Sequence, residues 1–260
     1  MPRSIWNGTI AFGLMTVPVK LHTATESKTV HFSEVHLDDG ARIEHRRFCS
    51  REDKEVEYKE VVKGYEVSES TYVVLDKEEI AAAAGDRGHV IDVEHFVDAG
   101  EIDPVFYEKT YYLGAGKDGA EPYRLLHDAL DATGRAGIGR FTFHDREYLA
   151  AVRAVDGVLV LHTLRFVDEL VPGADVDVPE PSRGPGRREV EMARRLIDTL
   201  HEDFRPDGYE DEYRQAVLDV IERKAAGEEI APSEEPEAGD QDDLMAMLEA
   251  SLGGARKGGR

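Results

Sequence analysis

The chain has 260 residues, with 32 lysines and arginines against 54 aspartates and glutamates, so its formal net charge is −22. This charge excludes a nucleic-acid binder unless basic side chains are gathered on one surface and acids cover the rest. No apolar stretch approaches the roughly 20 residues of a membrane helix, residues 1–20 do not resemble a signal peptide, and the single cysteine excludes an internal disulfide framework. We therefore expect a cytoplasmic protein without a membrane partner.

Residues 1 to about 180 are predicted to be rich in β-strands. Asp156-Gly157 is the clearest two-residue hairpin signal, and Asp38-Asp39-Gly40 predicts a second hairpin between His31–Leu37 and Arg42–Phe48. Many short strands joined by such turns are typical of a barrel or sandwich. Further strands are expected at 16–22, 72–75, 89–97, 105–113, 141–143, 148–155 and 158–166.

Helices interrupt and follow this pattern. The apolar run Tyr72–Leu75 predicts a buried strand, and Asp76 is a suitable N-cap for a short helix through Ala84. Apolar residues recur at helical spacing between Leu125 and Thr133, and Gly134 is expected to end that helix. Two amphipathic helices are predicted at 190–204 and 209–224, separated by a Pro-Asp-Gly break.

The composition changes divide the chain into three predicted regions. Residues 1–181 form the β-rich core, residues 182–227 a helical region, and residues 228–260 an acidic linker followed by a short amphipathic tail helix. The tail carries only part of the negative charge. No internal repeat is evident.

The segments that resemble catalytic or cofactor-binding motifs lack residues or a structural context that those motifs require. The segment Gly114–Asp118 lacks the first glycine and the metal-binding hydroxyl of a phosphate loop. The glycine-rich segment Gly134–Gly139 follows a helix rather than a strand, so a β-turn is predicted there instead of a dinucleotide site. Cys49 has no evident general base, and His31, His36, His45 and Cys49 lack the close ligand pairs of a structural zinc site. Neither an enzyme nor a metal site is therefore expected.

Basic residues gather in three places that could contact phosphate. One cluster surrounds residues 42–54, a second is spread between residues 124 and 153, and the densest covers residues 183–195. Interleaved acids such as Glu44, Glu52 and Asp53 leave open the alternative that these are ordinary solvated surfaces.

A series of segments, in order along nearly the whole chain, resembles the bacterial Ku family. The carrying segments are Ile5–Leu14, Val17–Leu21, Ala24–Glu26, Arg42–Cys49, Val61–Glu66, Tyr72–Leu75, Phe96–Val97, Glu101–Pro104, Tyr111–Leu113, Arg146–Ala151, Asp211–Arg214 and Lys224–Gly227. The resemblance implies a mainly β fold with α, in which a Ku-core β-barrel carries a dimerisation and DNA-encircling arm and a helical C-terminal region. It implies a non-enzymatic homodimeric ring that binds ends of double-stranded DNA, in the nucleoid, without sequence preference. It also implies recruitment of the bacterial multifunctional end-joining DNA ligase in non-homologous end joining.

Arm residues in the stretches 42–54 and 107–140 are expected to line the bore of this ring. The predicted DNA-binding residues are Arg42, Arg46, Arg47, Lys54, Lys109, Arg124, Arg135 and Arg140. The paired-cysteine element that some relatives carry near the early hairpin is not expected here, because Glu52 stands three residues after Cys49, and no cofactor is expected. The tail lacks the lysine-rich extension of some relatives, and its apolar stripe is predicted to dock a partner through Leu244, Met245, Leu248 and Leu252.

Two other classes of function remain open. An enzyme built on a β-barrel would need a nucleophile and base or a metal constellation. A protein–protein adaptor that does not touch DNA would suit the acidic charge.

Overall fold

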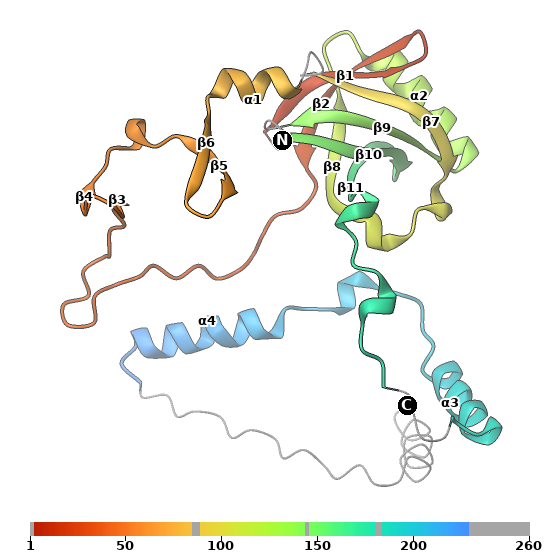
Figure 1. The fold of residues 1–260 in the computed structure, drawn as a ribbon. Helices are drawn as coiled ribbons and strands as arrows, with labels where there is room; N and C mark the ends of the chain where they lie inside the picture. Colours follow the sequence, from red (N-terminus) through yellow and green to blue (C-terminus); the bar gives the residue numbers. More distant parts are fainter. Residues whose placement is uncertain (1–2, 85–88, 144–145, 180–183, 229–260) are drawn as a thin grey trace. The chain divides into compact units, whose positions relative to one another are not determined.

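The computed structural model describes residues 3–84, 89–143, 146–179 and 184–228. It separates into two compact units, the first made of residues 1–28 and 33–175 and the second of residues 29–32 and 176–260. The first unit contains the barrel and, except for residues 29–32, the long connection between two of its strands (Figure 1).

Seven strands in the described part of the chain close into a barrel in the order β1-β2-β8-β11-β10-β9-β7. Neighbouring strands are antiparallel, except that β1 and β7 are parallel. The fold class expected from the sequence, mainly β with α, is confirmed. The strands are β1 Trp6–Phe12, β2 Met15–Thr23, β7 Val90–Asp98, β8 Tyr107–Ala115, β9 Arg135–Phe143, β10 Arg146–Val155 and β11 Val158–Leu164.

The barrel interior is filled by alternate residues of its strands. Ile10, Val19, Ile91, Phe141 and Leu161 are among the side chains of this core that have almost no exposed surface. Alternation places the remaining residues of each strand on the outer face. A smaller outer cluster of Ala136, Ala151 and Leu164 is covered by apolar residues between 97 and 107.

Helix α2, Ala120–Thr133, packs against β2, β9 and β10. Leu126 and Leu130 enter the barrel core, and Tyr123 joins the helix to two strands. Its hydroxyl donates to the Leu113 carbonyl at 2.6 Å and accepts from the Leu159 amide at 2.8 Å. Gly134 ends the helix in the left-handed conformation with φ 64°, as the sequence predicts.

The structure requires glycine, or a residue that tolerates a positive φ, at Gly157, and it leaves no room for a side chain at Gly139. Asp156 and Gly157 have φ 48° and 82°, which confirms the predicted two-residue hairpin between β10 and β11. The predicted turn over Gly134–Gly139 is wrong beyond Gly134, because residues 135–139 belong to β9. A Cβ at Gly139 would lie 2.1 Å from the Asp92 carbonyl oxygen, so the glycine there allows β7 and β9 to approach closely.

The connection between β2 and β7, residues 24–89, is called the arm below. It contains β3 Phe48–Cys49, β4 Lys54–Glu55, a 3₁₀ turn Tyr58–Glu60, β5 Lys63–Ser68, β6 Thr71–Leu75 and α1 Lys77–Ala84. The expected α1 cap is confirmed, since Asp76 accepts from the Glu79 amide at 2.8 Å. The hairpin expected around Asp38-Asp39-Gly40 is reduced to a turn and one bridge between Val35 and Arg42.

The second unit holds α3 Arg187–Thr199, a 3₁₀ turn Pro206–Gly208 and α4 Glu212–Ala225. Helix α3 ends before Leu200 and Phe204, so the first predicted amphipathic helix is shorter than its apolar pattern. Further 3₁₀ turns in the first unit are Ala99–Glu101, Pro104–Phe106, Val167–Glu169 and Gly173–Asp175. In the described ranges, no helix combines the length and apolar character needed to cross a membrane.

Candidate nucleic-acid interface

Four of the predicted DNA-binding residues lie in the arm, and three of them, Arg46, Arg47 and Lys54, lie at the hairpin of β3 and β4. Lys54 pairs with Cys49 across this hairpin, and the Val56 amide donates to the Arg47 carbonyl at 2.9 Å. The Arg47 guanidinium lies over the Tyr58 ring at 5.0 Å from its centroid. Arg46 forms ion pairs with Glu55 at 3.3 Å and Glu44 at 3.7 Å. Arg42 forms the bridge with Val35 a few residues earlier.

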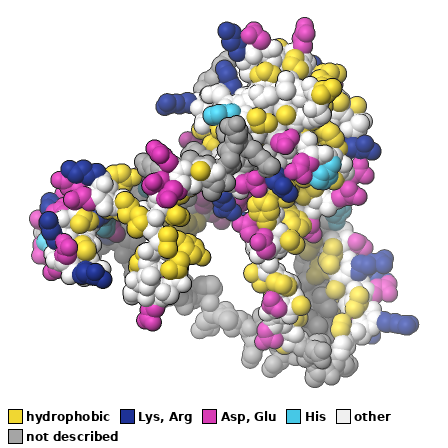
Figure 2. Space-filling model, turned by 45° about the horizontal axis from the view of Figure 1, so that its top comes forward, with side chains coloured by type: hydrophobic (Ala, Val, Ile, Leu, Met, Phe, Trp, Pro, Cys, Tyr) yellow, Lys and Arg dark blue, Asp and Glu magenta, His cyan; other side chains and the backbone are white. Residues whose placement is uncertain are grey.

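The arm ion pairs do not prevent a phosphate contact. The side chains of Arg46, Glu44 and Glu55 are more than half exposed, and exposed pairs of this kind contribute between about 0 and 1 kcal/mol. An incoming phosphate can therefore exchange with either carboxylate. In Figure 2, lysine and arginine side chains on the visible face are interspersed with carboxylates rather than gathered into one broad patch.

The other four predicted residues belong to the barrel and its helix, so the expectation that the stretch 107–140 is part of the arm is wrong. Lys109 on β8 lines a cavity of about 390 Å³ together with Thr23, Tyr111 and Tyr148. Arg124 on α2 pairs with Asp128 at 2.9 Å. The structure does not bring this set onto a single surface.

The two arginines of β9 point to different environments. Arg135 pairs with Asp98 at 3.5 Å and lines an apolar cavity of about 340 Å³ beneath α2. Arg140 pairs with Glu94 at 3.5 Å, and its buried Nε finds no hydrogen-bond partner among the residues that the structure describes. Both are therefore tied to carboxylates of the β7 strand beside them.

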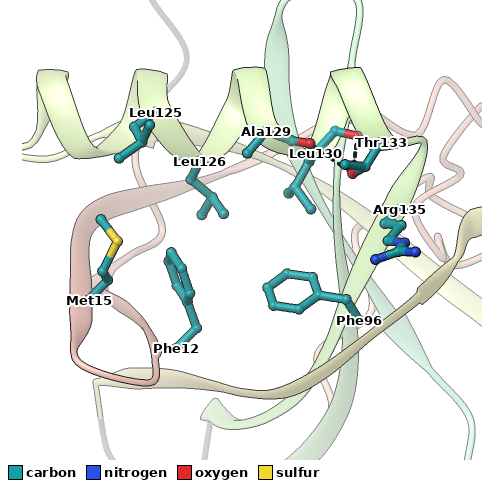
Figure 3. Close-up of a pocket in the computed structure, with 9 residues that line it drawn as sticks. All are labelled: Phe12, Met15, Phe96, Leu125, Leu126, Ala129, Leu130, Thr133 and Arg135. Atoms are coloured by element: carbon teal, nitrogen blue, oxygen red, sulfur yellow. Dashed lines mark hydrogen bonds between the residues drawn. The ribbon is translucent and has the colours of Figure 1, made fainter.

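The cavity beneath α2 is not a surface for nucleic acid. Figure 3 shows Leu126 and Leu130 pointing from the helix toward Phe12 and Phe96, with Arg135 at one end. A lining of this kind suits an apolar group rather than a phosphate.

A polar network on the outer face of the barrel was not identified from the sequence. The Arg153 Nε donates to His162 Nε2 at 3.0 Å, and His162 Nδ1 lies 3.0 Å from the Thr110 hydroxyl. Because Nε2 accepts, the neutral ring carries its proton on Nδ1 and donates it to Thr110. The Tyr107 ring packs edge-on against His162, with centroids 4.9 Å apart. Burial of His162, reinforced by the positive charge of Arg153, lowers its pKa to about 4.

These network residues come from three strands and are far apart in the chain. Thr110 lies on β8, Arg153 on β10 and His162 on β11, and only the pairing of these strands brings them together. In the sequence, the one feature that pointed to a residue of this network is the position of Arg153 next to the predicted hairpin at Asp156-Gly157.

The arm exposes a large amount of apolar surface. Both strands of the β5–β6 hairpin are exposed along their whole length, and the predicted burial of residues 72–75 is wrong. Tyr72, Val73 and Val74 are between 47% and 58% exposed. A two-stranded hairpin without a covering layer is marginally stable by itself. Its apolar surface therefore indicates an interaction site.

Other predicted features fall outside this geometry. Leu244, Met245, Leu248 and Leu252 lie outside the residues that the structure describes. Within the described ranges, no group of three or more histidine, cysteine, aspartate or glutamate side chains is placed to hold a metal ion. Cys49 is a free, partly exposed cysteine on β3.

Comparison with known proteins decides the family. The family model of the Ku70/Ku80 beta-barrel domain matches residues 11–192, which include the whole of the barrel from β2 onward and the arm. The chain belongs to the Ku family. The Ku resemblance of the sequence segments is thereby confirmed.

Several curated bacterial relatives are named "Non-homologous end joining protein Ku". The relative from Anaeromyxobacter sp. (strain K) is 43% identical over 261 residues, covering 100% of this chain and 88% of the relative. The relative from Solibacter usitatus is 35% identical over 252 residues, covering 97% and 94%. The relative from Symbiobacterium thermophilum is 41% identical over 253 residues, covering 96% of this chain but only 62% of its own length.

Proposed function

We propose that this Ku chain binds the ends of double-stranded DNA in non-homologous end joining. The observation that carries the proposal is the Ku barrel match over residues 11–192, together with relatives that carry the end-joining name over almost the whole chain. The protein acts by binding rather than by catalysis. Phosphate contacts hold the duplex, so binding is independent of sequence and weakens as salt rises.

The active form is a homodimeric ring closed by the arms of two copies. The apolar hairpin of β5 and β6 supports this, since it needs a covering layer that the described residues of its own chain do not supply. Enclosure also reconciles DNA binding with a net charge of −22, because cations such as those around β3 and β4 can face the bore while acids cover the outside.

The dimer proposal is tested by placing a charged side chain on the β5–β6 hairpin of the arm. Val73→Asp on β6 should give a monomer, because it buries a carboxylate in an apolar interface. Leu14→Asp is the matched control, since Leu14 is fully exposed in the turn between β1 and β2. Light scattering after size exclusion measures the mass. A dimeric V73D, or loss of the dimer in both variants, contradicts the proposed arm interface.

Recruitment of the multifunctional end-joining DNA ligase completes the proposed function. The apolar stripe Leu244, Met245, Leu248 and Leu252 is the proposed partner-docking element, and its acidic linker gives it reach. Deletion of residues 240–260 should reduce ligase stimulation, dimerisation or end bridging. Unchanged values for all three would contradict a docking role of the stripe.

The end-binding proposal itself is tested by competition between linear and relaxed closed-circular DNA of one sequence at two salt concentrations. Preference for the linear form, weakening with salt, is expected. Equal binding to both forms contradicts end recognition, and binding to neither favours the adaptor function.

A further inference from the structure

The outer face of strands β2, β8, β11 and β10 has few carboxylates, although the chain as a whole is strongly acidic. One residue of each strand marks the side that faces the core: Val19, Leu113, Leu161 and Val152. Residues at odd-numbered separations from these along the same strand face outward. These outward residues include Lys20, His22, Thr110, Tyr112, Val160, His162 and Arg153.

Carboxylates are absent from the part of this face that lies toward α2. Glu147, the outward acid of β10, is the second residue of that strand, at the opposite end. Glu108, beside the bulge near the beginning of β8, accepts from the Thr163 hydroxyl at 3.3 Å. Asp156 follows β10 in the hairpin turn. Apart from the apolar Val160, the middle of the face therefore carries positive and neutral polar groups.

Arg153 differs from most barrel arginines in its partner. Arg124, Arg135, Arg140 and Arg146 are each paired with a carboxylate. Among the described residues, no carboxylate lies within ion-pair distance of Arg153, and its Nε is instead held by the neutral ring of His162. This arrangement orders the guanidinium while leaving its positive charge uncompensated and its terminal nitrogens available.

The neighbours of Arg153 form a row across the sheet. The strand registers pair His22 with Tyr112, Tyr112 with Val160, and Val160 with Arg153. Three strand spacings separate the ends of this row by about 14 Å. Lys20 lies exposed beside it on β2, and Tyr112 is 45% exposed. Arginine, lysine and tyrosine are donors that contact phosphate oxygens in nucleic-acid complexes.

We propose that Arg153, with Lys20 and Tyr112 beside it, contacts phosphates of duplex DNA on the outer barrel face, and that His162 is the positioning residue for Arg153. This inference rests on the proposed DNA-binding function and adds a barrel surface to the arm residues expected from the sequence. Val160, buried in the middle of the row, keeps the surface closely packed.

The test compares two arginines of the same strand. Arg153→Gln and the control Arg146→Gln remove the same charge from β10, but Arg146 is the first residue of the strand, away from the row, and is paired with Glu169 at 2.6 Å. Affinity for a linear duplex at pH 7.5 is measured over a range of salt concentrations. R153Q should bind about tenfold more weakly at low salt and lose about one unit of the logarithmic salt slope, while R146Q should match the wild type.

The positioning role of His162 is tested by a pair of substitutions. His162→Gln retains an acceptor for Arg153 and should keep most of the affinity, whereas His162→Leu fills the buried site without an acceptor and should approach R153Q. Equal affinity of R153Q and R146Q, with wild-type end binding intact, overturns this inference and leaves the proposed function standing. Failure of the wild type to bind any duplex removes both. Equal binding by H162Q and H162L removes the positioning role.

Discussion

The buried His162 should make the barrel sensitive to mild acid. Its pKa is about 4 in the folded protein against 6.5 in an exposed chain, so the unfolded state binds the proton more readily. Its contribution to stability is complete above pH 6.5 and is lost as the pH falls toward 4. Between pH 7.5 and pH 5, linkage predicts a loss of about 2 kcal/mol in the free energy of unfolding.

The assay is urea denaturation of wild type and His162→Gln at several pH values in this window. Carboxylates titrate in both proteins, so their effect cancels in the difference between the two curves. Glutamine does not titrate, and H162Q should therefore lose about 2 kcal/mol less than the wild type on acidification.

An exposed histidine provides the control. His201 lies exposed in the second unit, and His201→Gln should follow the wild-type curve. Parallel curves for wild type and H162Q would refute the reasoning, because they would mean that His162 binds its proton equally well in the folded and unfolded states.

Two substitutions in the barrel test its packing by thermal or urea unfolding. Gly139→Ala should destabilise the protein strongly or prevent folding, because the new Cβ would lie 2.1 Å from the Asp92 carbonyl oxygen; Gly173→Ala, with open space around it, should be near neutral, and a similar result for both would contradict the close approach of β7 and β9. Leu161→Ala should cost about 2–5 kcal/mol because Leu161 is fully buried in the barrel. A cost below about 1 kcal/mol would contradict its place in the core.

Local signals allowed accurate prediction of several elements. Asp156-Gly157, Gly134 and Asp76 each act within a few residues of their own position, as a hairpin turn, a helix stop and a helix cap. The Ku resemblance supplied the barrel, whose strand order β1-β2-β8-β11-β10-β9-β7 depends on pairings between distant segments.

The predictions that were wrong concern residues whose environment is set by tertiary packing, which a local sequence pattern does not contain. The run 72–75 has the composition of a buried strand, but the arm hairpin leaves it exposed. The glycines of β9 resemble a turn, yet Gly139 serves a close contact with β7. Of the predicted DNA-binding residues, Arg46, Arg47 and Lys54 lie together at β3 and β4. The barrel residues are divided among α2, β8 and β9, and their partners differ.

Topological trapping tests the central claim, a ring that threads onto DNA ends, most directly. The protein is loaded on linear DNA, the DNA is circularised, and both forms are washed at high salt. A ring cannot leave a closed circle, so the account predicts retention on the circularised DNA and loss from the linear DNA. Equal loss from both forms would contradict encirclement.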